Sequence, residues 1–551
     1  MKKENKNKKK KKENKKEKLK IKKEVLTEEQ LEKIKLEKIE FEKKSKKFVI
    51  FFLILISIFS IGLVVKTFQN DTFYTIEIGE LILQNGIDMK DHFSFHENLP
   101  YTYPHWLYDV FIYLCYAVGG YTGIYISTIV LLIILMFVVF KISKFITNKT
   151  SIAAFGTLIC ALSVGGFATA RAQLVSFLIF ALEMYFIELF LKNGKKKYLF
   201  GLLILSILLC NIHLAVWPFY FILYLPYLAE YIISFIASKI KIKKENKIIR
   251  FFKNKFVLEK NENIKYLFLT MLFSLLTGFI TPLHGTPYTY TFKMAMSNAQ
   301  EYVQEHQMLG WLQSPFTIII TIETLFLSLF SKVKLRDLFM ICGLILMSIV
   351  SIRHLSLLAL IGTICFVRLF SMFFENFGLD VDKKVIPFFN KKIVAIISCL
   401  VVVIGSSVLF AFQVKKEFID DEKYPVEAVK YIKENINIDE MRIFNEYNFG
   451  SYLLHHDIPV FIDSRADLYT AEYSNWDYDI FDDYHYMPTH YQKKFDFYGI
   501  THALIYKELK EGISPLYTAF NNDSNYKILY EDEYFVLYEK LGMHDIVITY
   551  N

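Results

Sequence analysis

Cysteine is scarce in this chain, and its spacing fits neither a disulfide framework nor a metal site. The 551 residues include six cysteines, all in or beside apolar runs, and no two of them have CxxC spacing. This excludes a disulfide-stapled domain and a thiolate zinc site, so the cysteines are expected to be packing residues. A cleavable leader is also lacking, because residues 1–47 are too rich in lysine and no cleavage site follows the first apolar run. That run is expected to remain as an anchor.

Apolar residues are present in excess. The chain is 53% hydrophobic, with 52 Phe and 36 Tyr, and its mean hydropathy is +0.29. Soluble domains are a little under half apolar, and about 20 apolar residues are enough to cross a bilayer. Runs near this length occur at 48–66, 121–141, 151–170, 174–191, 198–217, 218–237, 266–283, 315–331, 338–352, 355–373 and 393–412. The predicted fold is a polytopic α-helical membrane protein with about 11 transmembrane helices.

The charges are divided between the two ends of the chain. Residues 1–47 carry 21 Lys against 10 Glu, whereas residues 413–551 carry 13 Lys and Arg against 26 Asp and Glu. Lysine-rich segments stay in the cytoplasm. The sequence thus predicts a cytoplasmic tail (1–47), a transmembrane domain (48–412) with a first outer loop at 67–120, and an extracytoplasmic α/β domain (413–551). The multi-pass protein is expected in the cell membrane.

The lysine tail is expected to set this topology and to attract anionic membrane lipids. Nucleic-acid binding is disfavoured, because no aromatic residues alternate with the lysines and no nucleic-acid-binding fold is indicated.

Ionisable side chains recur at the predicted outer ends of the spans, where they tend to mark function. These are Asp71, Arg171, His213, His284, Arg353 and His354. Two arginines can grip a phosphate, and a carboxylate can act as general base toward a hydroxyl. Together they indicate transfer of a group from a lipid phosphate at the outer leaflet. Alternatives remain for each: Asp71 as a helix cap, the arginines as headgroup contacts, and the histidines as packing residues.

The segment after Asp71 predicts a helix over 72–85. Its apolar residues Tyr74, Ile78, Leu81 and Ile82 form one stripe, which is typical of a helix that lies in the membrane interface. Residues 90–109, including His105, are rich in histidine and aromatic residues and suit the same interface.

The C-terminal segment reads as a small α/β domain. A helix is expected at 424–436, and strands are expected at 441–445, 459–463, 502–506, 527–532 and 534–540. The acidic stretch 457–485 matches no calcium-binding pattern, so a solvated loop is expected there. Within it, Asp463 and Arg465 are expected to form an ion pair that fixes the loop, or else to help bind an acceptor.

Three glutamates lie inside the predicted spans: Glu183, Glu188 and Glu323. For Glu183, paired burial against a neighbouring helix is favoured over catalysis.

The order of these elements resembles the GT-C membrane glycosyltransferases, such as protein O-mannosyltransferases and transferases that use polyprenyl-phosphate sugars. It resembles most a large group of uncharacterised bacterial proteins of that plan. The resemblance covers roughly residues 48–540 and rests on DTFYTIEIG (71–79), DHFS (91–94), HWL (105–107), ARAQ (170–173), NIH (211–213), WLQSP (311–315), RH (353–354), FGSYL (449–453) and VFIDSRADLY (460–469). One departure is Thr75, where the group commonly has histidine.

The resemblance implies that Asp71 is the catalytic base, with Glu77 or Asp91 as a second acid. It implies that Arg171, Arg353 and, more weakly, His354 bind the donor phosphate. His105, His213, His284, Asp463 and Arg465 complete the set of candidate residues. Members differ in metal use, so a divalent metal ion stays open as a cofactor, and no residues here require one.

The first functional hypothesis is a glycosyltransferase that moves a sugar from a polyprenyl-phosphate carrier to an extracytoplasmic glycan, lipid or protein acceptor. The alternatives are a transporter or flippase of lipid-linked sugars and a non-catalytic relative that binds an envelope partner. The chain shows no internal repeat, which counts against the transporter.

Overall fold

The computed structural model describes residues 28–239, 254–297, 307–308, 315–474, 476–510 and 512–542. The lysine run 1–27, most of the basic stretch 239–255 and the first four residues of the WLQSP motif lie outside these ranges.

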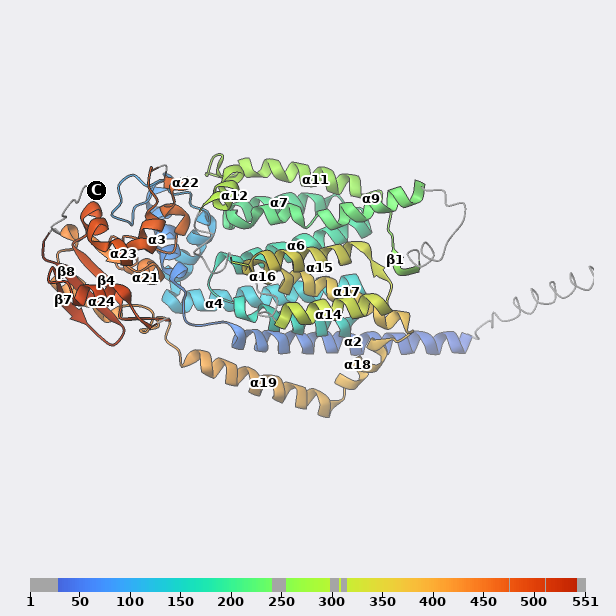
Figure 1. Ribbon diagram of the computed structural model, residues 1–551. Helices are drawn as coiled ribbons and strands as arrows, with labels where there is room; N and C mark the ends of the chain where they lie inside the picture. The colour runs from blue at the N-terminus through green and yellow to red at the C-terminus, as the bar shows by residue number, and fades with distance from the viewer. Residues whose placement is uncertain are drawn as a thin grey trace, which may run out of the picture.

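The eleven predicted spans correspond to helices of one elongated bundle (Figure 1). These helices are α2 (Glu28–Leu63), α4 (Trp106–Thr147), α5 (Thr150–Val164), α6 (Ala172–Asn193), α7 (Lys197–Ile212), α8 with α9 (Trp217–Ile222, Leu225–Lys239), α11 (Ile264–Leu276), α14 (Pro315–Phe330), α15 (Leu335–Val350), α16 with η7 and α17 (Leu355–Leu357, Leu358–Gly362, Thr363–Asn376) and α19 (Lys392–Val414). Within the described ranges, seven helical segments are long and apolar enough to cross a membrane. The chain is thus a multi-pass membrane protein.

The end of the bundle away from the C-terminal domain carries a buried cluster of charges. It surrounds a two-residue pairing of β1 (Phe256–Val257) with β2 (Val333–Lys334). Arg336 binds Glu188 and Glu230 at 3.3 and 3.1 Å, and Arg368 binds Glu188 and Asp337 at 2.5 and 2.9 Å. All five side chains are buried, so each charge needs its partners. The cluster joins α6, α9, α15 and α17.

Of the three glutamates predicted to lie inside spans, Glu188 is buried and paired with arginines of neighbouring helices. The other two are not paired in this way. Glu183 is fully buried on α6, and neither of its carboxylate oxygens has a hydrogen bond within the described part of the chain. Glu323 is exposed on α14.

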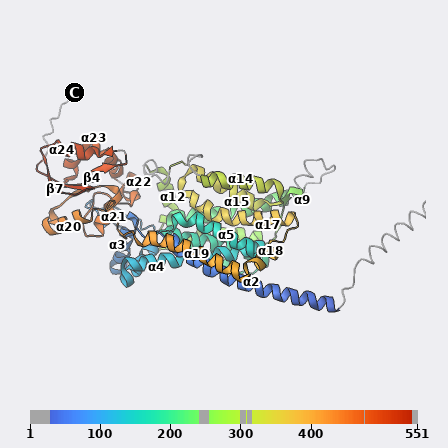
Figure 2. The ribbon, with the colours of Figure 1, turned by 90° about the horizontal axis from the view of Figure 1, so that it is seen from below.

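The first outer loop contributes two helical segments that pack against each other. These are α3 (Asn70–Asn85) and the start of α4, which bends at Gly120 (φ 59°) before entering the bundle. One face of α3 is buried against α4 and against α21 (Tyr447–Leu454) of the C-terminal domain, as Figure 2 shows from below. Of the predicted apolar stripe, Tyr74 and Ile78 are buried, whereas Leu81 and Ile82 are half-buried. Part of the stripe therefore packs on protein, and the placement of this helix in the membrane interface stays a prediction.

The C-terminal domain sits at the same end of the bundle as α3 (Figure 1). Its four-stranded sheet has the order β3 (Ile443–Asn445), β4 (His502–Tyr506), β8 (Phe535–Lys540), β7 (Tyr526–Glu531), with only the β3–β4 pair parallel. A two-stranded sheet pairs β5 (Glu508–Leu509) with β6 (Gly512–Ile513). The helices are α20 (Val426–Asn435), α21, η9 (Ala466–Tyr469), α22 (Ala471–Ser474), α23 (Ile480–Tyr498) and α24 (Pro515–Asn521). The helices α12 (Thr286–Met296) and α18 (Val381–Phe389) complete the membrane part.

Two predictions for this domain are wrong. Residues 459–463 are not a strand of the sheet: Asn445 binds the backbone of Phe461 and Ile462 through its side chain, and Val460 pairs with the first loop instead. The acidic stretch 457–485 is not a solvated loop, because Asp463 is fully buried and Asp467 is only 8% exposed.

The contact between α3 and α4 depends on a missing side chain. A Cβ atom on Gly79 would lie 2.2 Å from the carbonyl oxygen of Asp109 and 2.6 Å from Cβ of Tyr113. We expect Gly79→Ala to destabilise the protein by about 1–3 kcal/mol or more, because backbone would have to move. Gly119→Ala is the matched control: its Cβ would meet nothing within 4 Å, so helix propensity should make it neutral or stabilising. Thermal unfolding in detergent micelles measures both; equal midpoints for the two variants would contradict the close packing.

Candidate functional site

Asp71 and Arg171 form an ion pair at the end of the bundle that faces the C-terminal domain. Nη2 of Arg171 lies 2.6 Å from Oδ2 of Asp71, and the side chains are 28% and 24% exposed. Asp71 lies in the first turn of α3, whose N-cap is Gln69. The alternative that Asp71 caps this helix is therefore wrong. Arg171 is the N-cap residue of α6, on the short connection after the 3₁₀ turn η1 (Gly165–Phe167).

Arg353 and His213 meet in the same region. His213 ends α7, and its Nε2 lies 3.5 Å from Nη2 of Arg353, which belongs to the turn η6 (Ile352–His354). The hydroxyl of Ser176 donates to the backbone of Ala172 and lies 2.9 Å from Nδ1 of His213. Nδ1 is then the protonated nitrogen, which leaves Nε2 to accept from Arg353. Ser176 thus orients the histidine toward the arginine.

His105 lies beside His213 and within electrostatic range of both arginines. It is the N-cap residue of α4, and its ring centroid lies 5.0 Å from that of His213. Burial, followed by the positive charges of Arg353 and Arg171, lowers the pKa of His105 to about 3. The imidazole is therefore neutral at physiological pH. Because both arginines act on this one ring, we describe Asp71, Arg171, His105, His213 and Arg353 as the polar cluster.

Two other candidates lie apart from these contacts. Nδ1 of His354 lies 3.0 Å from the carbonyl oxygen of Met347, and its ring packs on Phe219. His284 is exposed on the turn before α12, with a left-handed backbone (φ 55°). No contact between His284 and the polar cluster occurs among the described residues.

Both candidates for a second acid contact side chains of the C-terminal domain. Oε1 of Glu77 lies 2.6 Å from Nδ1 of His455, whose Nε2 lies 2.9 Å from the Tyr121 hydroxyl. Oδ1 of Asp91 lies 2.7 Å from Nη1 of Arg465. Although burial opposes it, the Arg465 guanidinium holds the pKa of Asp91 below its usual range. Asp91 is thus an ionised partner of arginine, with its charge already compensated.

Arg465 is the centre of a buried triad formed by Asp91, Arg465 and Asp463. Its Nε and Nη2 bind the two carboxylate oxygens of Asp463 at 2.9 and 2.7 Å, while Nη1 faces Asp91. The Tyr469 hydroxyl also donates to Asp463, at 2.5 Å. The Asp463–Arg465 ion pair is present as the sequence suggested, but its extension to the first outer loop was not predicted. The triad fixes that loop to the C-terminal domain.

The sequence also gave no role to Asp467, which accepts a hydrogen bond from the Tyr290 hydroxyl of α12 at 3.1 Å. Its position within the DSRAD motif, two residues after Arg465, was the available signal.

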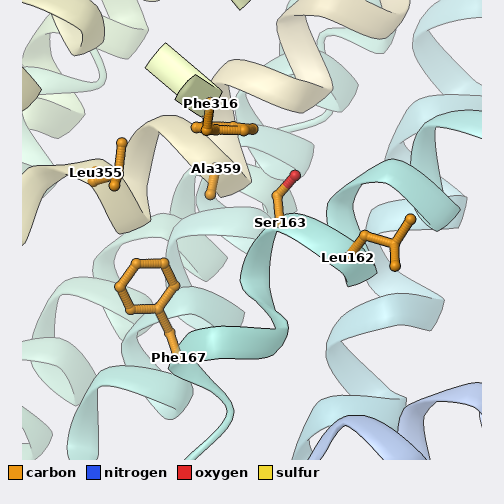
Figure 3. A pocket seen from close by; sticks show the side chains of 6 residues that line it. All are labelled: Leu162, Ser163, Phe167, Phe316, Leu355 and Ala359. Atoms are coloured by element: carbon orange, nitrogen blue, oxygen red, sulfur yellow. The ribbon is translucent and has the colours of Figure 1, made fainter. Parts of the chain in front are cut away.

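The helical segment that follows Arg353 contributes to an apolar pocket (Figure 3). Its volume is about 320 Å³, and it is lined by Leu355 and Ala359, two and six residues after Arg353 in the sequence. Phe316 of α14 and Leu162, Ser163 and Phe167 of α5 and η1 form the other walls. The wall at Ala359 belongs to a π-helical turn, Leu358–Gly362, a distortion that is frequent at functional sites.

No grouping of three or more histidine, cysteine or carboxylate side chains suited to a metal ion occurs within the described ranges. The polar cluster itself combines two guanidinium groups, a carboxylate and neutral imidazoles. This arrangement can bind a phosphate and accept a proton.

The chain combines a membrane bundle, a first loop that contains packed helices, and a polar cluster at the end of the bundle that faces the C-terminal domain. This combination was compared with known proteins. No family model and no curated protein matches the chain. It is similar to the crystal structure of ArnT from Cupriavidus metallidurans bound to undecaprenyl phosphate: TM-score 0.50, 9% identity, 90% of this chain and 98% of that chain covered. The apo structure of the same ArnT gives a TM-score of 0.51, 10% identity and coverage of 90% and 97%. This chain therefore shares the fold of ArnT, a GT-C fold.

Because Arg465 is the only cation of the triad, we expect its removal to lower the stability of the protein strongly. Arg465→Met should destabilise the protein by about 3–5 kcal/mol, because Asp463 and Asp91 would remain buried without a counter-charge. Arg442→Met is the matched control: this arginine is exposed and donates to one backbone carbonyl, so a loss within about 1 kcal/mol is expected. The thermal midpoints of the two variants in detergent decide the matter, and similar losses would show that the triad is not essential for stability.

Proposed function

We propose that the chain is a membrane glycosyltransferase that moves a sugar from a polyprenyl-phosphate carrier to an acceptor hydroxyl. The observation that carries the proposal is the partly exposed Asp71–Arg171 pair, with Arg353 and His105 beside it. A carboxylate that receives a proton and guanidinium groups that stabilise a leaving phosphate are the two requirements of this transfer.

The reaction follows from these groups. Asp71 takes the proton of the acceptor hydroxyl while the oxygen of that hydroxyl forms a bond to the anomeric carbon of the sugar. The bond between that carbon and the phosphate oxygen breaks, and the phosphate leaves with the electron pair. Arg171 and Arg353 stabilise the phosphate charge through bidentate hydrogen bonds.

The apolar pocket lined by Leu355 and Ala359 could hold the chain of the carrier. Its walls are aliphatic and aromatic apart from Ser163, which suits an isoprenoid chain whose phosphate reaches the arginine two residues before Leu355. ArnT, whose fold this chain shares, was solved with undecaprenyl phosphate bound, which supports a carrier of this class.

We place the site on the extracytoplasmic face of the cell membrane. The polar cluster and the acidic C-terminal domain lie at one end of the bundle. The lysine-bearing start of α2 and the end of α9 at Lys239 lie at the other end (Figure 1). The lysine-rich end is then cytoplasmic.

The proposal predicts a selective loss of activity in Asp71→Asn. Purified protein is incubated with a panel of polyprenyl-phosphate sugars and a cell-envelope extract, and released polyprenyl phosphate is followed by mass spectrometry. Without its general base, Asp71→Asn should be about 10²–10⁴-fold slower. Glu97→Gln, a matched neutralisation of an exposed acid in the same loop, should release at the wild-type rate. Release that persists in Asp71→Asn would remove the base from the mechanism.

Arg353 is expected to act on the phosphate rather than on the proton. Arg353→Ala should lower release about 100-fold, whereas Arg353→Lys keeps the charge without the bidentate geometry and should retain part of the rate. Equal rates in Arg353→Ala and the wild type would exclude this arginine from donor binding.

A further inference from the structure

Asp467 brings a carboxyl group from the C-terminal domain to the membrane domain. It lies on η9, and its Oδ2 accepts from the hydroxyl of Tyr290 on α12 at 3.1 Å. The Tyr473 hydroxyl of α22 donates to the backbone carbonyl of Tyr290 at 2.8 Å. Figure 1 shows α12 and α22 together at the junction of the two domains. These contacts fix the position of Asp467 relative to the bundle.

Asp467 differs from its acidic neighbours in how its charge is compensated. Asp463 and Asp91 share the guanidinium of Arg465. Asp467 is buried as well, yet it forms no ion pair with any residue the structure describes. Burial raises the pKa of Asp467. A buried carboxyl group without a counter-ion is unfavourable for stability, and such groups concentrate at functional sites.

Asp467 also belongs to the surroundings of Asp71. The hydroxyls of Tyr74 and Tyr447 lie within electrostatic range of both carboxyl groups. The hydroxyl of Tyr290 lies within range of both Asp467 and Arg353. Asp467, from the C-terminal domain, and Asp71, the proposed base, thus act electrostatically on the same two tyrosine hydroxyls.

We propose that Asp467, together with the hydroxyl of Tyr290, binds the acceptor, by hydrogen bonds to a hydroxyl group next to the one that Asp71 deprotonates. The acceptor is then a polyhydroxylated, carbohydrate-like molecule. A carboxyl group accepts hydrogen bonds from hydroxyls and repels phosphate, so Asp467 suits the acceptor and not the donor. Its place in the outer domain agrees with an acceptor that arrives from outside the bilayer. The inference rests on the proposed function.

The test separates the two substrates. Full-length wild type, Asp467→Asn, Tyr290→Phe and the double variant are assayed for polyprenyl phosphate release with the donor that the wild type uses. The envelope extract is titrated at saturating donor, and the donor is titrated at saturating extract. Asp477→Asn, an exposed acid of the same segment, is the matched control. One portion of extract is treated with periodate, which cleaves vicinal diols.

We expect the half-saturating amount of extract to rise about tenfold in Asp467→Asn and in Tyr290→Phe, with little further increase in the double variant. The half-saturating donor concentration should stay within twofold of the wild-type value, and periodate should abolish acceptor activity. Asp477→Asn should match the wild type.

The contrary outcomes are distinct. A fall in maximal rate with unchanged half-saturation by extract, or an equal change for the donor, would make Asp467 a structural residue and overturn the inference. Acceptor activity that survives periodate would overturn the assignment of a carbohydrate-like acceptor. No release by the wild type from any donor would overturn the proposed function, and this inference with it.

Discussion

The arrangement of the site depends on one buried guanidinium group. Arg465 compensates Asp463 within its own loop and Asp91 in the first outer loop, and all three side chains are almost fully buried. Removing three charges from water is costly, and only complete mutual pairing offsets that cost. The C-terminal domain and the first loop must therefore dock in one register. The contacts Asn70–Tyr447 and Glu77–His455 lie on α3 itself, so the same docking fixes the helix that carries Asp71.

The buried charges of the two ends of the bundle serve different purposes. At the end with β1 and β2, Arg336 and Arg368 are enclosed by Glu188, Glu230 and Asp337, and the cluster links four helices. At the other end the Asp71–Arg171 pair remains about one quarter exposed, and Arg353 lies 3.5 Å from Nε2 of His213. Enclosed pairs suit a rigid joint, whereas a partly exposed pair can exchange partners with a substrate. The bundle thus has enclosed ion pairs at one end and a partly exposed ion pair at the end for which we propose the reaction.

Local patterns predicted most of the fold, and contacts between distant segments account for the failures. The apolar runs form helices, as predicted. The helix predicted at 424–436 is α20, and the strands predicted at 502–506 and 534–540 are β4 and β8. The sequence of residues 459–463 is typical of a strand. In the structure, however, the side chain of Asn445 accepts from the backbone N–H of Phe461 and donates to the carbonyl oxygen of Ile462. The acidic stretch looks solvated because nothing in its own sequence shows that Asp91 and Tyr290 will lie beside it. Of the candidate site, Asp71, Arg171, His213 and Arg353 could be named from their positions at the span ends; Ser176 and Asp467 required the fold.

The Asp71–Arg171 pair has a consequence for the order of events in the proposed reaction. The guanidinium of Arg171 lies 2.6 Å from the carboxylate of Asp71, so one oxygen of the proposed base is engaged by the arginine. A phosphate with two negative oxygens competes for the same guanidinium by bidentate hydrogen bonds. In the proposed reaction, donor binding would draw Arg171 from Asp71 and free the carboxylate oxygen to accept a hydrogen bond from the acceptor hydroxyl. On this proposal the arginine, rather than the carboxylate, is the residue that responds first to the donor.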